Sequence, residues 1–356
     1  MTAPPLTGLR VVEFASMGPG PHCAMLFADL GAEILRIERD GGDGWPNPVV
    51  ERGRARLTLD LRSPADRERA IEIVAAADIL IEGNRPGVME RLGLGPDAML
   101  DRNPRLIYGR MTGWGQTGPL AATAGHDINY IALSGVLGAL GAAGEVPQPP
   151  LNLIGDFGGG SMFLAFGIMA ALWERERSGK GQVVDAAIVD GVASMLSIFT
   201  GMRPGLLNME RGHNVMAGAA PHYRCYRCAD DRFIAVGAME AKFHAELLER
   251  IGAPSELTAR RTDDAIWAET ADLFAEIFAR RTRDEWCTIL EGADACFTPV
   301  LDIGEVPSHP HIAARETYME ADTCLQPAPA PRFSRTPGRI GSQTDPAEML
   351  ARWGLD

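Results

Sequence analysis

The first residues of the chain alternate between continuous apolar runs and amphipathic segments. Residues 9–14 and 32–37 are apolar runs of strand length, which predicts two buried strands. Between them, the turn Gly18-Pro19-Gly20-Pro21 opens a segment with helical spacing that continues to about Leu30. This order predicts a βαβ unit, in which the two strands lie parallel in one sheet.

The same alternation continues beyond this unit. Strands are predicted over residues 56–61, 78–81 and 106–111, and a helix over 64–77 has proline in its first turn. Residues 161–177 are apolar almost all round, which predicts a buried central helix. A further strand over 183–188 leads into another helix. The expected fold class is therefore α/β, with a mostly parallel, Rossmann-like sheet.

The second half of the chain has a different pattern. Pro204, Gly205, Gly212, Gly218 and Pro221 interrupt regular structure, and beyond them two strand-like runs form a predicted hairpin, followed by amphipathic helices. We therefore predict a large domain, a smaller α+β domain, two connecting linkers and a C-terminal return to the large domain. The large domain spans residues 1–190 and the small domain 222–306. The linkers are 191–221 and 307–329, and residues 330–356 return to the large domain.

Composition and charge exclude several classes of protein. The chain has 356 residues, of which 46% are hydrophobic, so it can bury a sizeable core. Its net charge of −13 argues against a nucleic-acid or anionic-membrane partner. Residues 1–7 lack a signal-peptide pattern, no apolar run approaches the roughly 20 residues of a membrane span, and the six cysteines are scattered. We expect a cytoplasmic protein with reduced thiols and no membrane partner.

Two glycine-flanked segments carry the candidate catalytic chemistry. One is Gly125-His126-Asp127-Ile128-Asn129-Tyr130, and the other is Gly155-Asp156-Phe157-Gly158-Gly159-Gly160. An imidazole and a carboxyl group on opposite sides of one carbon acid could each exchange a proton with it. Taken alone, His126 is more simply a hydrogen-bonded histidine and Asp156 a helix cap. Glu240 follows a predicted strand of the small domain. Residue spacing does not show that these three groups meet.

Arginines crowd the first domain of this otherwise acidic protein. Guanidinium groups match phosphate oxygens with a forked set of donors, so a cluster of them suggests a polyanionic ligand. Only Lys180 and Lys242 among the 34 basic residues are lysine, so genome composition also explains part of the arginine content. The cluster comprises Arg39, Arg52, Arg54, Arg56, Arg62, Arg85 and Arg91.

Other motifs are weaker. Three glycines before Ser161 could place free N–H groups at a helix start, but they do not form the G-x-G-x-x-G fingerprint of dinucleotide binding. Cys225 and Cys228 lack the second pair that a zinc site would need. Methionines 195, 202, 209 and 216 recur every seven residues, and with Met162, Met169 and Met239 they suit either a flexible apolar binding surface or core packing.

Four long motifs together resemble those of the α-methylacyl-CoA racemases, within the family III CoA-transferases. They are the two segments that contain His126 and Asp156, the segment Glu82-Gly-Asn-Arg85-Pro-Gly-Val, and the segment Arg110-Met-Thr-Gly-Trp-Gly-Gln-Thr-Gly. The resemblance extends from about Leu6 to at least Glu240. It implies a Rossmann-like large domain that holds coenzyme A, a small domain, and an interlocked homodimer with its active site between the large domain of one subunit and the small domain of the other.

The resemblance also implies roles for particular residues. His126 and Asp156 correspond to the two bases, and Glu240 to the glutamate that supports the histidine from the partner subunit. One departure is Asn84, where close relatives are expected to carry an aromatic residue. The methionines correspond to a surface for the acyl chain. The implied coenzyme A positions are Arg39, Leu59, Asp60, Leu61, Arg62, Gly83, Asn84, Arg85, Arg91, Gly125, Asp127, Ile128, Asn129 and Tyr130.

The expected activity is interconversion of (R)- and (S)-2-methylacyl-CoA thioesters by proton transfer through an enolate, with no metal and no cofactor beyond the coenzyme A of the substrate. One alternative is a CoA-transferase in which Asp156 attacks the thioester as a nucleophile. The other is an acyl-CoA-binding protein without catalytic activity. His126 favours proton transfer, because a transferase needs no second base.

Overall fold

A computed structural model describes residues 2–42, 47–202, 208–321 and 324–355. The chain divides into two compact units, and each is described by itself. The first comprises Met1–Ser134, Pro149–Ser197 and Glu316–Asp356, and the second comprises Gly135–Gln148 and Ile198–Arg315. Pro204 and Gly205, which contributed to the predicted linker, lie outside the described residues. The domain boundaries inferred from the sequence stay predictions.

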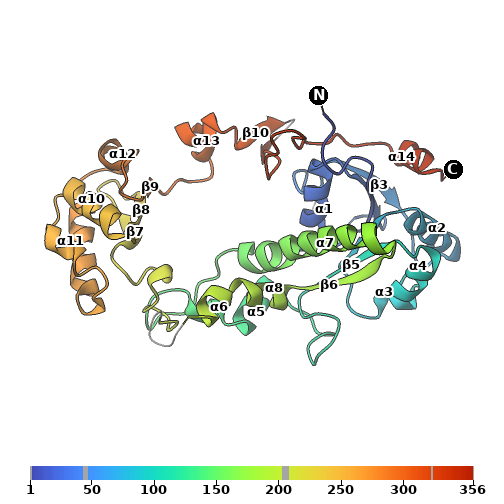
Figure 1. Cartoon of the computed structure of the whole chain (residues 1–356), viewed down its shortest axis with the longest axis horizontal. Helices are drawn as coiled ribbons and strands as arrows, with labels where there is room; N and C mark the ends of the chain where they lie inside the picture. Colours follow the sequence, from blue (N-terminus) through green and yellow to red (C-terminus); the bar gives the residue numbers. More distant parts are fainter. Residues whose placement is uncertain (1, 43–46, 203–207, 322–323, 356) are drawn as a thin grey trace. The chain divides into compact units, whose positions relative to one another are not determined.

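The first unit is built on a six-stranded sheet in which every neighbouring pair of strands is parallel. The strand order is β3-β2-β1-β4-β5-β6, which is that of a Rossmann fold. Figure 1 labels β3, β5 and β6 of this sheet and the helices of the same unit. The predicted α/β class is confirmed. The strands are β1 (Arg10–Phe14), β2 (Glu33–Glu38), β3 (Arg54–Thr58), β4 (Ile79–Glu82), β5 (Ile107–Thr112) and β6 (Gln182–Ala187).

Helices cover this sheet, so that β1, β2, β4 and β5 are buried over most of their length. α2 (Pro64–Ala75), α4 (Pro96–Arg102) and α14 (Pro346–Trp353) contribute to one core with alternate strand residues such as Val12 and Leu35. α1 (Pro19–Asp29) and α7 (Met162–Ser178) contact each other and the strands. The C-terminal helix α14 is fixed by Trp353, whose indole N–H donates to Glu33 at 2.7 Å.

The third strand begins earlier and ends earlier than the predicted 56–61. β3 starts at Arg54, whose guanidinium lies beside the fully buried Glu13, so a charged residue occupies a core position. The prediction missed this start because an unpaired arginine is rarely buried. At the other end, the Leu59 N–H still donates to Glu38 O at 3.0 Å, and the chain then turns at Asp60.

The glycine-rich segment is helical, which the sequence analysis did not predict. Leu153–Ser161 forms a π-helix, η1, that continues directly into α7. The three glycines therefore lie within a helix, and the predicted free N–H groups at a helix start are absent from this described segment. Close packing explains the glycines: a Cβ added to Gly191 of α8 (Ile188–Met195) would lie 1.9 Å from Gly159 O.

The prediction that α7 is buried all round is wrong for one face. Met162, Phe166, Met169 and Trp173 are exposed, at 52%, 74%, 41% and 70%, whereas Leu164 and Ile168 pack inside. The expectation that no apolar run approaches the length of a membrane span also needs correction. Among the described residues, the continuous helix Leu153–Ser178 is long and apolar enough to span one by length and composition, which are criteria that a core helix of a soluble protein also meets.

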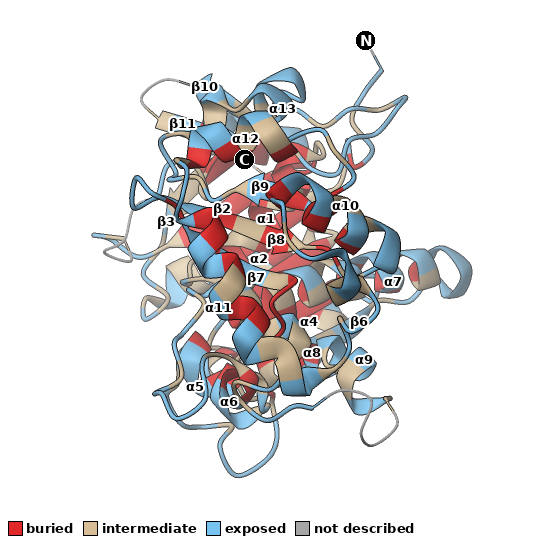
Figure 2. Ribbon diagram, turned by 90° about the vertical axis from the view of Figure 1, so that its left-hand side faces the viewer, coloured by how far each residue is buried: buried red, intermediate tan, exposed pale blue. Residues whose placement is uncertain are grey.

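The second unit contains a three-stranded antiparallel sheet of β7 (Tyr223–Arg227), β8 (Phe233–Gly237) and β9 (Phe297–Pro299). One face packs on α10 (Ala241–Ile251), α11 (Trp267–Phe278) and α12 (Arg283–Leu290), whose inward sides are buried (Figure 2). The predicted hairpin and helices are present. β9 was missed because three residues are too few for a strand pattern.

The remaining helices and strands are short. They are α3 (Val88–Arg91), α5 (Asp127–Leu133), α6 (Val136–Ala139), α9 (Ser197–Thr200), α13 (Pro310–Ala314), β10 (Tyr318–Ala321), β11 (Cys324–Pro327), and the 3-10 turns η2 (Val215–Ala217), η3 (Ser255–Thr258), η4 (Asp264–Ile266) and η5 (Val306–Ser308).

Candidate active site

A pocket of about 380 Å³ lies at the carboxyl ends of the central strands in the first unit. The segments that follow β1, β4 and β5 line it, through Ser16–Pro19, Gly83–Pro86 and Thr112–Trp114 respectively. β1 and β4 are neighbours from which the strand order proceeds in opposite directions. Such a switch point leaves a crevice between diverging loops, and it is where open α/β sheets bind ligands.

His126 and Asp156 both line this pocket, so the fold brings together the two groups that the sequence could only suggest. His126 immediately precedes α5 and is exposed. Its backbone N–H donates to Asn129 Oδ1 at 3.0 Å, which fixes the start of the helix. Asp156 lies on η1, a type of helix that is rare in proteins and concentrated at functional sites.

The surroundings of Asp156 favour its protonated form. Burial raises the pKa of this carboxyl group, and the nearby negative charge of Asp127 raises it further. A hydrogen bond from Asn152 Nδ2 to Asp156 Oδ2, at 3.1 Å, and the positive charge of His126 act in the opposite direction on the pKa. The net direction is upward, as a carboxylic acid needs if it is to donate a proton near neutral pH.

Several positions implied for coenzyme A line the same pocket. Tyr130 donates its hydroxyl to Gly125 O at 2.5 Å and meets the Trp114 ring edge-on, with 4.8 Å between ring centroids. This contact leaves no space for a side chain at position 125, since a Cβ there would lie 2.8 Å from Tyr130 Cε1. The implied coenzyme A positions that line the pocket are Gly83, Asn84, Arg85, Gly125 and Tyr130.

Other implied coenzyme A positions lie outside the pocket lining. Leu59, Asp60, Leu61 and Arg62 follow β3, where the exposed Arg62 pairs with Asp60 at 2.9 Å. Arg39 follows β2, and Arg91 ends α3. Ile128 is exposed on α5, Asn129 holds the His126 N–H, and Asp127 is buried behind Asp156.

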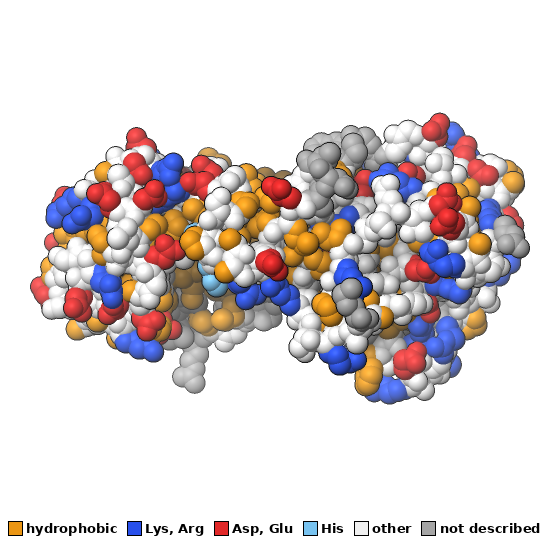
Figure 3. All heavy atoms as spheres, turned by 90° about the horizontal axis from the view of Figure 1, so that it is seen from above, with side chains coloured by type: hydrophobic (Ala, Val, Ile, Leu, Met, Phe, Trp, Pro, Cys, Tyr) orange, Lys and Arg blue, Asp and Glu red, His pale blue; other side chains and the backbone are white. Residues whose placement is uncertain are grey.

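Some arginines of the cluster are engaged in ion pairs within the fold, whereas Arg85 lines the pocket. Arg52 and Arg54 are buried in ion pairs with Asp29 and Glu13, so they stabilise the fold and cannot reach a ligand. Arg56 pairs with Glu38 and Glu51. The expected local excess of positive charge is therefore smaller than the sequence indicates, and Figure 3 shows acidic and basic side chains interspersed over the visible face. Of the predicted arginines, Arg85 lines the described pocket.

Glu240 belongs to the second unit, where it is the exposed residue that precedes α10. Its backbone carbonyl accepts the His244 N–H at 2.9 Å. Its support of His126 stays a prediction.

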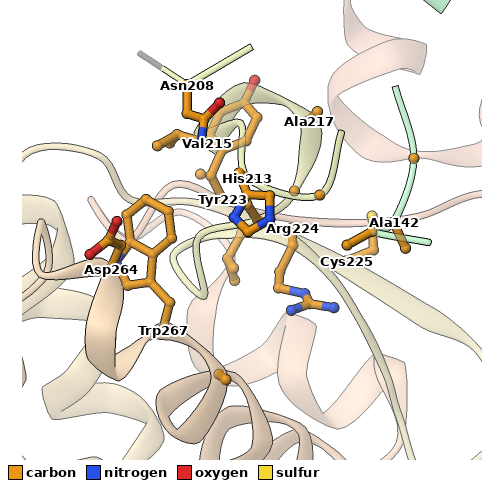
Figure 4. Close-up of a pocket in the computed structure, with 18 of the residues that line it drawn as sticks. Ala142, Asn208, His213, Val215, Ala217, Tyr223, Arg224, Cys225, Asp264 and Trp267 are labelled. Atoms are coloured by element: carbon orange, nitrogen blue, oxygen red, sulfur yellow. The ribbon is translucent and has the colours of Figure 1, made fainter. Parts of the chain in front are cut away.

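A larger hollow, of about 1270 Å³, lies within the second unit (Figure 4). Its lining includes small side chains from the open face of the sheet, among them Cys225 and Ala235, together with His213, Arg224 and Asp264. None of the three predicted catalytic residues lines it. Cys225 is exposed here, whereas Cys228 is buried in the core of the unit. Within the described ranges, no group of three or more histidine, cysteine, aspartate or glutamate residues could hold a metal ion.

Sequence reasoning missed several polar residues in and around the candidate site. Asn152 was given no role, although its spacing of about one helical turn from Asp156 could have suggested the contact. Ser16 Oγ and Trp114 Nε1 line or face the pocket and have no hydrogen-bond partner among the described residues. His22 of α1 holds Ser161, at the end of η1, with 2.7 Å between Nδ1 and Oγ, and its ring contacts Phe157. No local pattern marks that pair.

The fold and the pocket define a doubly wound α/β protein with an imidazole and a carboxyl group at the switch point of the sheet. Residues 6–348 match CoA-transferase family III, and the chain belongs to this family. It is 45% identical to the alpha-methylacyl-CoA racemase of Mus musculus, over 98% of this chain and 93% of that protein. It is 42% identical to the corresponding racemase of Homo sapiens, over 98% of this chain and 94% of that protein.

Solved structures show the same fold. A CAIB/BAIF family protein from Brucella suis superposes with a TM-score of 0.83 at 25% identity, covering 99% of this chain and 100% of that one. The family match extends well beyond Glu240, where the recognisable sequence motifs end, so the second unit belongs to the same family architecture.

Proposed function

We propose that this protein is a racemase that interconverts (R)- and (S)-2-methylacyl-CoA thioesters by proton transfer through an enolate. The observation that carries this proposal is the presence of His126 and Asp156 in one pocket at the switch point of the sheet. The similarity to alpha-methylacyl-CoA racemases over nearly the whole chain supports the same activity.

Each turnover moves two protons and leaves the enzyme ready for the reverse reaction. Neutral His126 removes the α-proton from one face, and the electrons of the broken C–H bond move onto the thioester oxygen to form the enolate. Protonated Asp156 then gives its proton to the opposite face, which leaves an imidazolium and a carboxylate. The raised pKa of Asp156 supports this assignment, because the acid must hold its proton while the imidazole is free to accept one.

The enolate oxygen needs hydrogen-bond donors as its charge forms. The first N–H groups of a helix have no acceptor within that helix. In α5 they begin at Asp127, directly after His126, so they are the donors that we propose. Arg85 and the loop residues Gly83 and Asn84 would contact coenzyme A from the other side of the pocket.

We further propose that the protein acts as an interlocked homodimer. The exposed residues Met162, Phe166, Met169 and Trp173 recur at helical spacing along one face of α7, and we call this face the α7 stripe. Apolar stripes of this size commonly mark contacts with another chain. In this arrangement Glu240 of the partner subunit would support His126 and stabilise its imidazolium form.

The homodimer is tested by placing a charge on the stripe. Phe166→Glu should convert a dimer into a monomer in sedimentation experiments and should remove most of the activity, since the partner's glutamate would be lost. Val146→Glu places the same charge on another exposed apolar residue and should leave the dimer intact. A wild-type protein that sediments as a monomer at working concentration would contradict the homodimer.

The activity is tested by incubating each enantiomer of a 2-methylacyl-CoA ester with the enzyme in deuterated water. The proposal requires α-deuteration and inversion from both enantiomers, read by NMR. If instead hydroxylamine traps an activated acyl group on Asp156 during transfer to a second acid, the protein is a CoA-transferase. Tight binding of the ester with neither reaction would identify an acyl-CoA-binding protein.

A further inference from the structure

A second carboxylate, that of Asp127, is buried against the segment that carries Asp156. Asp127 is only 6% exposed. Its Oδ1 accepts the backbone N–H of Asp156 at 2.7 Å, and within the part of the chain that the structure describes its Oδ2 is buried without a hydrogen-bond partner. A buried, half-satisfied carboxylate is costly, so its presence needs a compensating reason.

The geometry of this contact is unusual for a residue at the start of a helix. An aspartate there ordinarily accepts N–H groups of its own helix. The Asp127 side chain instead reaches a residue 29 positions away and joins α5 to η1. Gly155 provides the space: a Cβ at that position would lie 2.3 Å from Asp127 Oδ1 and 2.8 Å from its Cγ. The absence of a side chain at position 155 thus lets the carboxylate reach the Asp156 N–H.

We propose that the Asp127 side chain is a positioning residue for Asp156. One of its oxygens holds the Asp156 backbone in place, and its negative charge, set directly behind the second base, opposes ionisation of that base. This inference rests on the proposed racemase function and deepens it. It assigns Asp127 a role toward the acid, in addition to the backbone contact with the substrate proposed above.

Two neighbouring carboxyl groups do not ionise together readily. The negative charge of Asp127 therefore favours the protonated form of Asp156, from which the proton can be donated to the enolate. The direction of the pKa shift of Asp156 agrees: burial raises it most, and the charge of Asp127 adds to the rise. A positive charge on His126 lowers it, so the residue before α5 and the first residue of α5 have opposite effects on the pKa of Asp156.

The other titratable groups on the elements that pack against η1 are mostly engaged elsewhere. His22 bonds Ser161, Arg110 pairs with Glu82 and Glu90, Asp185 accepts the Gln116 N–H, and Asp190 is exposed. The phenol of Tyr130 also faces Asp156, and its own pKa is raised by burial and by that carboxyl group. Among these groups, Asp127 is the one joined to Asp156 by a hydrogen bond.

Two substitutions separate the two parts of this role. Asp127→Asn keeps an oxygen that can accept the Asp156 N–H but removes the charge. Asp127→Ala removes both. Asp101→Asn is the matched control, because it makes the same chemical change at an exposed position on α4.

The first measurement is a titration of carboxyl groups, which does not depend on catalytic activity. Carboxyl groups of the ¹³C-labelled full-length protein are titrated by NMR, with Asp156 assigned by its loss in Asp156→Asn. We expect Asp156 to lose its proton at a lower pH in Asp127→Asn than in the wild type and in Asp101→Asn. An unchanged titration of Asp156 in Asp127→Asn would overturn the inference, whether or not the enzyme proves to be a racemase.

The second measurement follows proton donation to the face of the substrate served by Asp156. In Asp127→Asn the rate should begin to fall at a lower pH than in the wild type, with KM little changed. In Asp127→Ala kcat should fall a further 10- to 100-fold, about the effect of a misplaced catalytic group. Equal kcat in the two variants would overturn the positioning part. If Asp127→Ala does not fold, the titration of Asp127→Asn still decides the charge effect. Absence of deuterium exchange in the wild type would refute the racemase proposal alone.

Discussion

The two units of this protein place titratable side chains in opposite surroundings. In the first unit, His126 and Asp156 line an opening in which each can meet a ligand. In the second, His222 and His244 are 3% and 1% exposed and pack edge to face, with 5.5 Å between ring centroids. Burial lowers the pKa of His244 to about 4, helped by His222 and Arg261, so this histidine is a neutral core residue.

The cavities of the two units differ both in volume and in the residues that line them. The second unit has the larger one, yet the first unit has the pocket in which an acid and a base converge at the switch point of a sheet. The volume of a cavity therefore does not locate the chemistry here. What locates it is the meeting of an imidazole with a carboxyl group whose pKa is raised by burial.

The largest expected effect comes from removing one base of the first pocket. Asp156→Asn and His126→Ala should each lower racemisation by about 10²- to 10⁴-fold, the range attributed to a positioned acid or base. Each variant should still exchange the α-proton from one enantiomer, because the remaining base serves one face. The measurement is α-deuteration of the separate (R)- and (S)-esters in deuterated water.

The two variants must favour opposite enantiomers for the comparison to hold. Equal residual exchange from both enantiomers in either variant would show that the pocket does not divide its two faces between His126 and Asp156. His213→Ala, in the hollow of the second unit, is the matched histidine substitution and should retain two-sided exchange.

A smaller effect should follow from Gly155→Ala, which leaves both bases in place. The new methyl group would overlap Asp127 Oδ1 and lie 3.2 Å from Ile131 Cγ2, so the carboxylate behind Asp156 has to move. We expect kcat to fall about 10- to 100-fold, as for a misplaced catalytic group. Steady-state kinetics together with thermal melting would separate displacement of the acid from general unfolding.

The control for this substitution is Gly138→Ala in the second unit, where an added Cβ would meet no atom within 4 Å. Its activity should match that of the wild type. Wild-type kcat in Gly155→Ala would mean that the contact between Asp127 and η1 has no influence on the reaction.

The strands of the first unit show which parts of the fold could be predicted from the sequence and which could not. Strands such as β1 and β4 are mostly apolar, and their hydrophobic pattern was enough to predict them. β3 was misplaced because Arg54 occupies a core position that only its distant partner Glu13 makes tolerable. A local pattern contains no information about such a partner.

The candidate site, like the strands, could be predicted only in part from the sequence. The motifs around His126 and Asp156 predicted the two bases by resemblance, and the fold brings these residues into one pocket. Their roles as bases stay predictions. The role of Asp127 could not be read from the sequence, because it depends on a 2.7 Å contact between segments 29 residues apart. The π-helix was missed for a related reason: its glycines resemble a turn, and their packing on α8 is tertiary.

The smallest expected effect concerns the buried histidines of the second unit, His222 and His244. It is a change in how the stability of the fold depends on pH. Since the pKa of His244 is lowered in the fold, the unfolded chain binds a proton at this residue between about pH 6.5 and 4 that the folded chain does not. Stability is therefore fully present above that range. It falls as pH decreases through the range, by at most about 1.4 kcal/mol per pH unit from this residue. The lowered pKa of His222 acts in the same direction.

Thermal melting of the wild type and of His244→Gln across this pH range measures the effect. The melting temperature of the variant should depend less on pH, because glutamine retains a partner for the Thr258 hydroxyl, which lies 3.2 Å from His244 Nδ1, but does not titrate. His311→Gln removes an exposed histidine from α13 and should follow the wild-type curve. Parallel curves for wild type and His244→Gln would mean that His244 gains a proton without opening the core, and the distinction between a neutral core histidine and a catalytic one would then lose its physical basis.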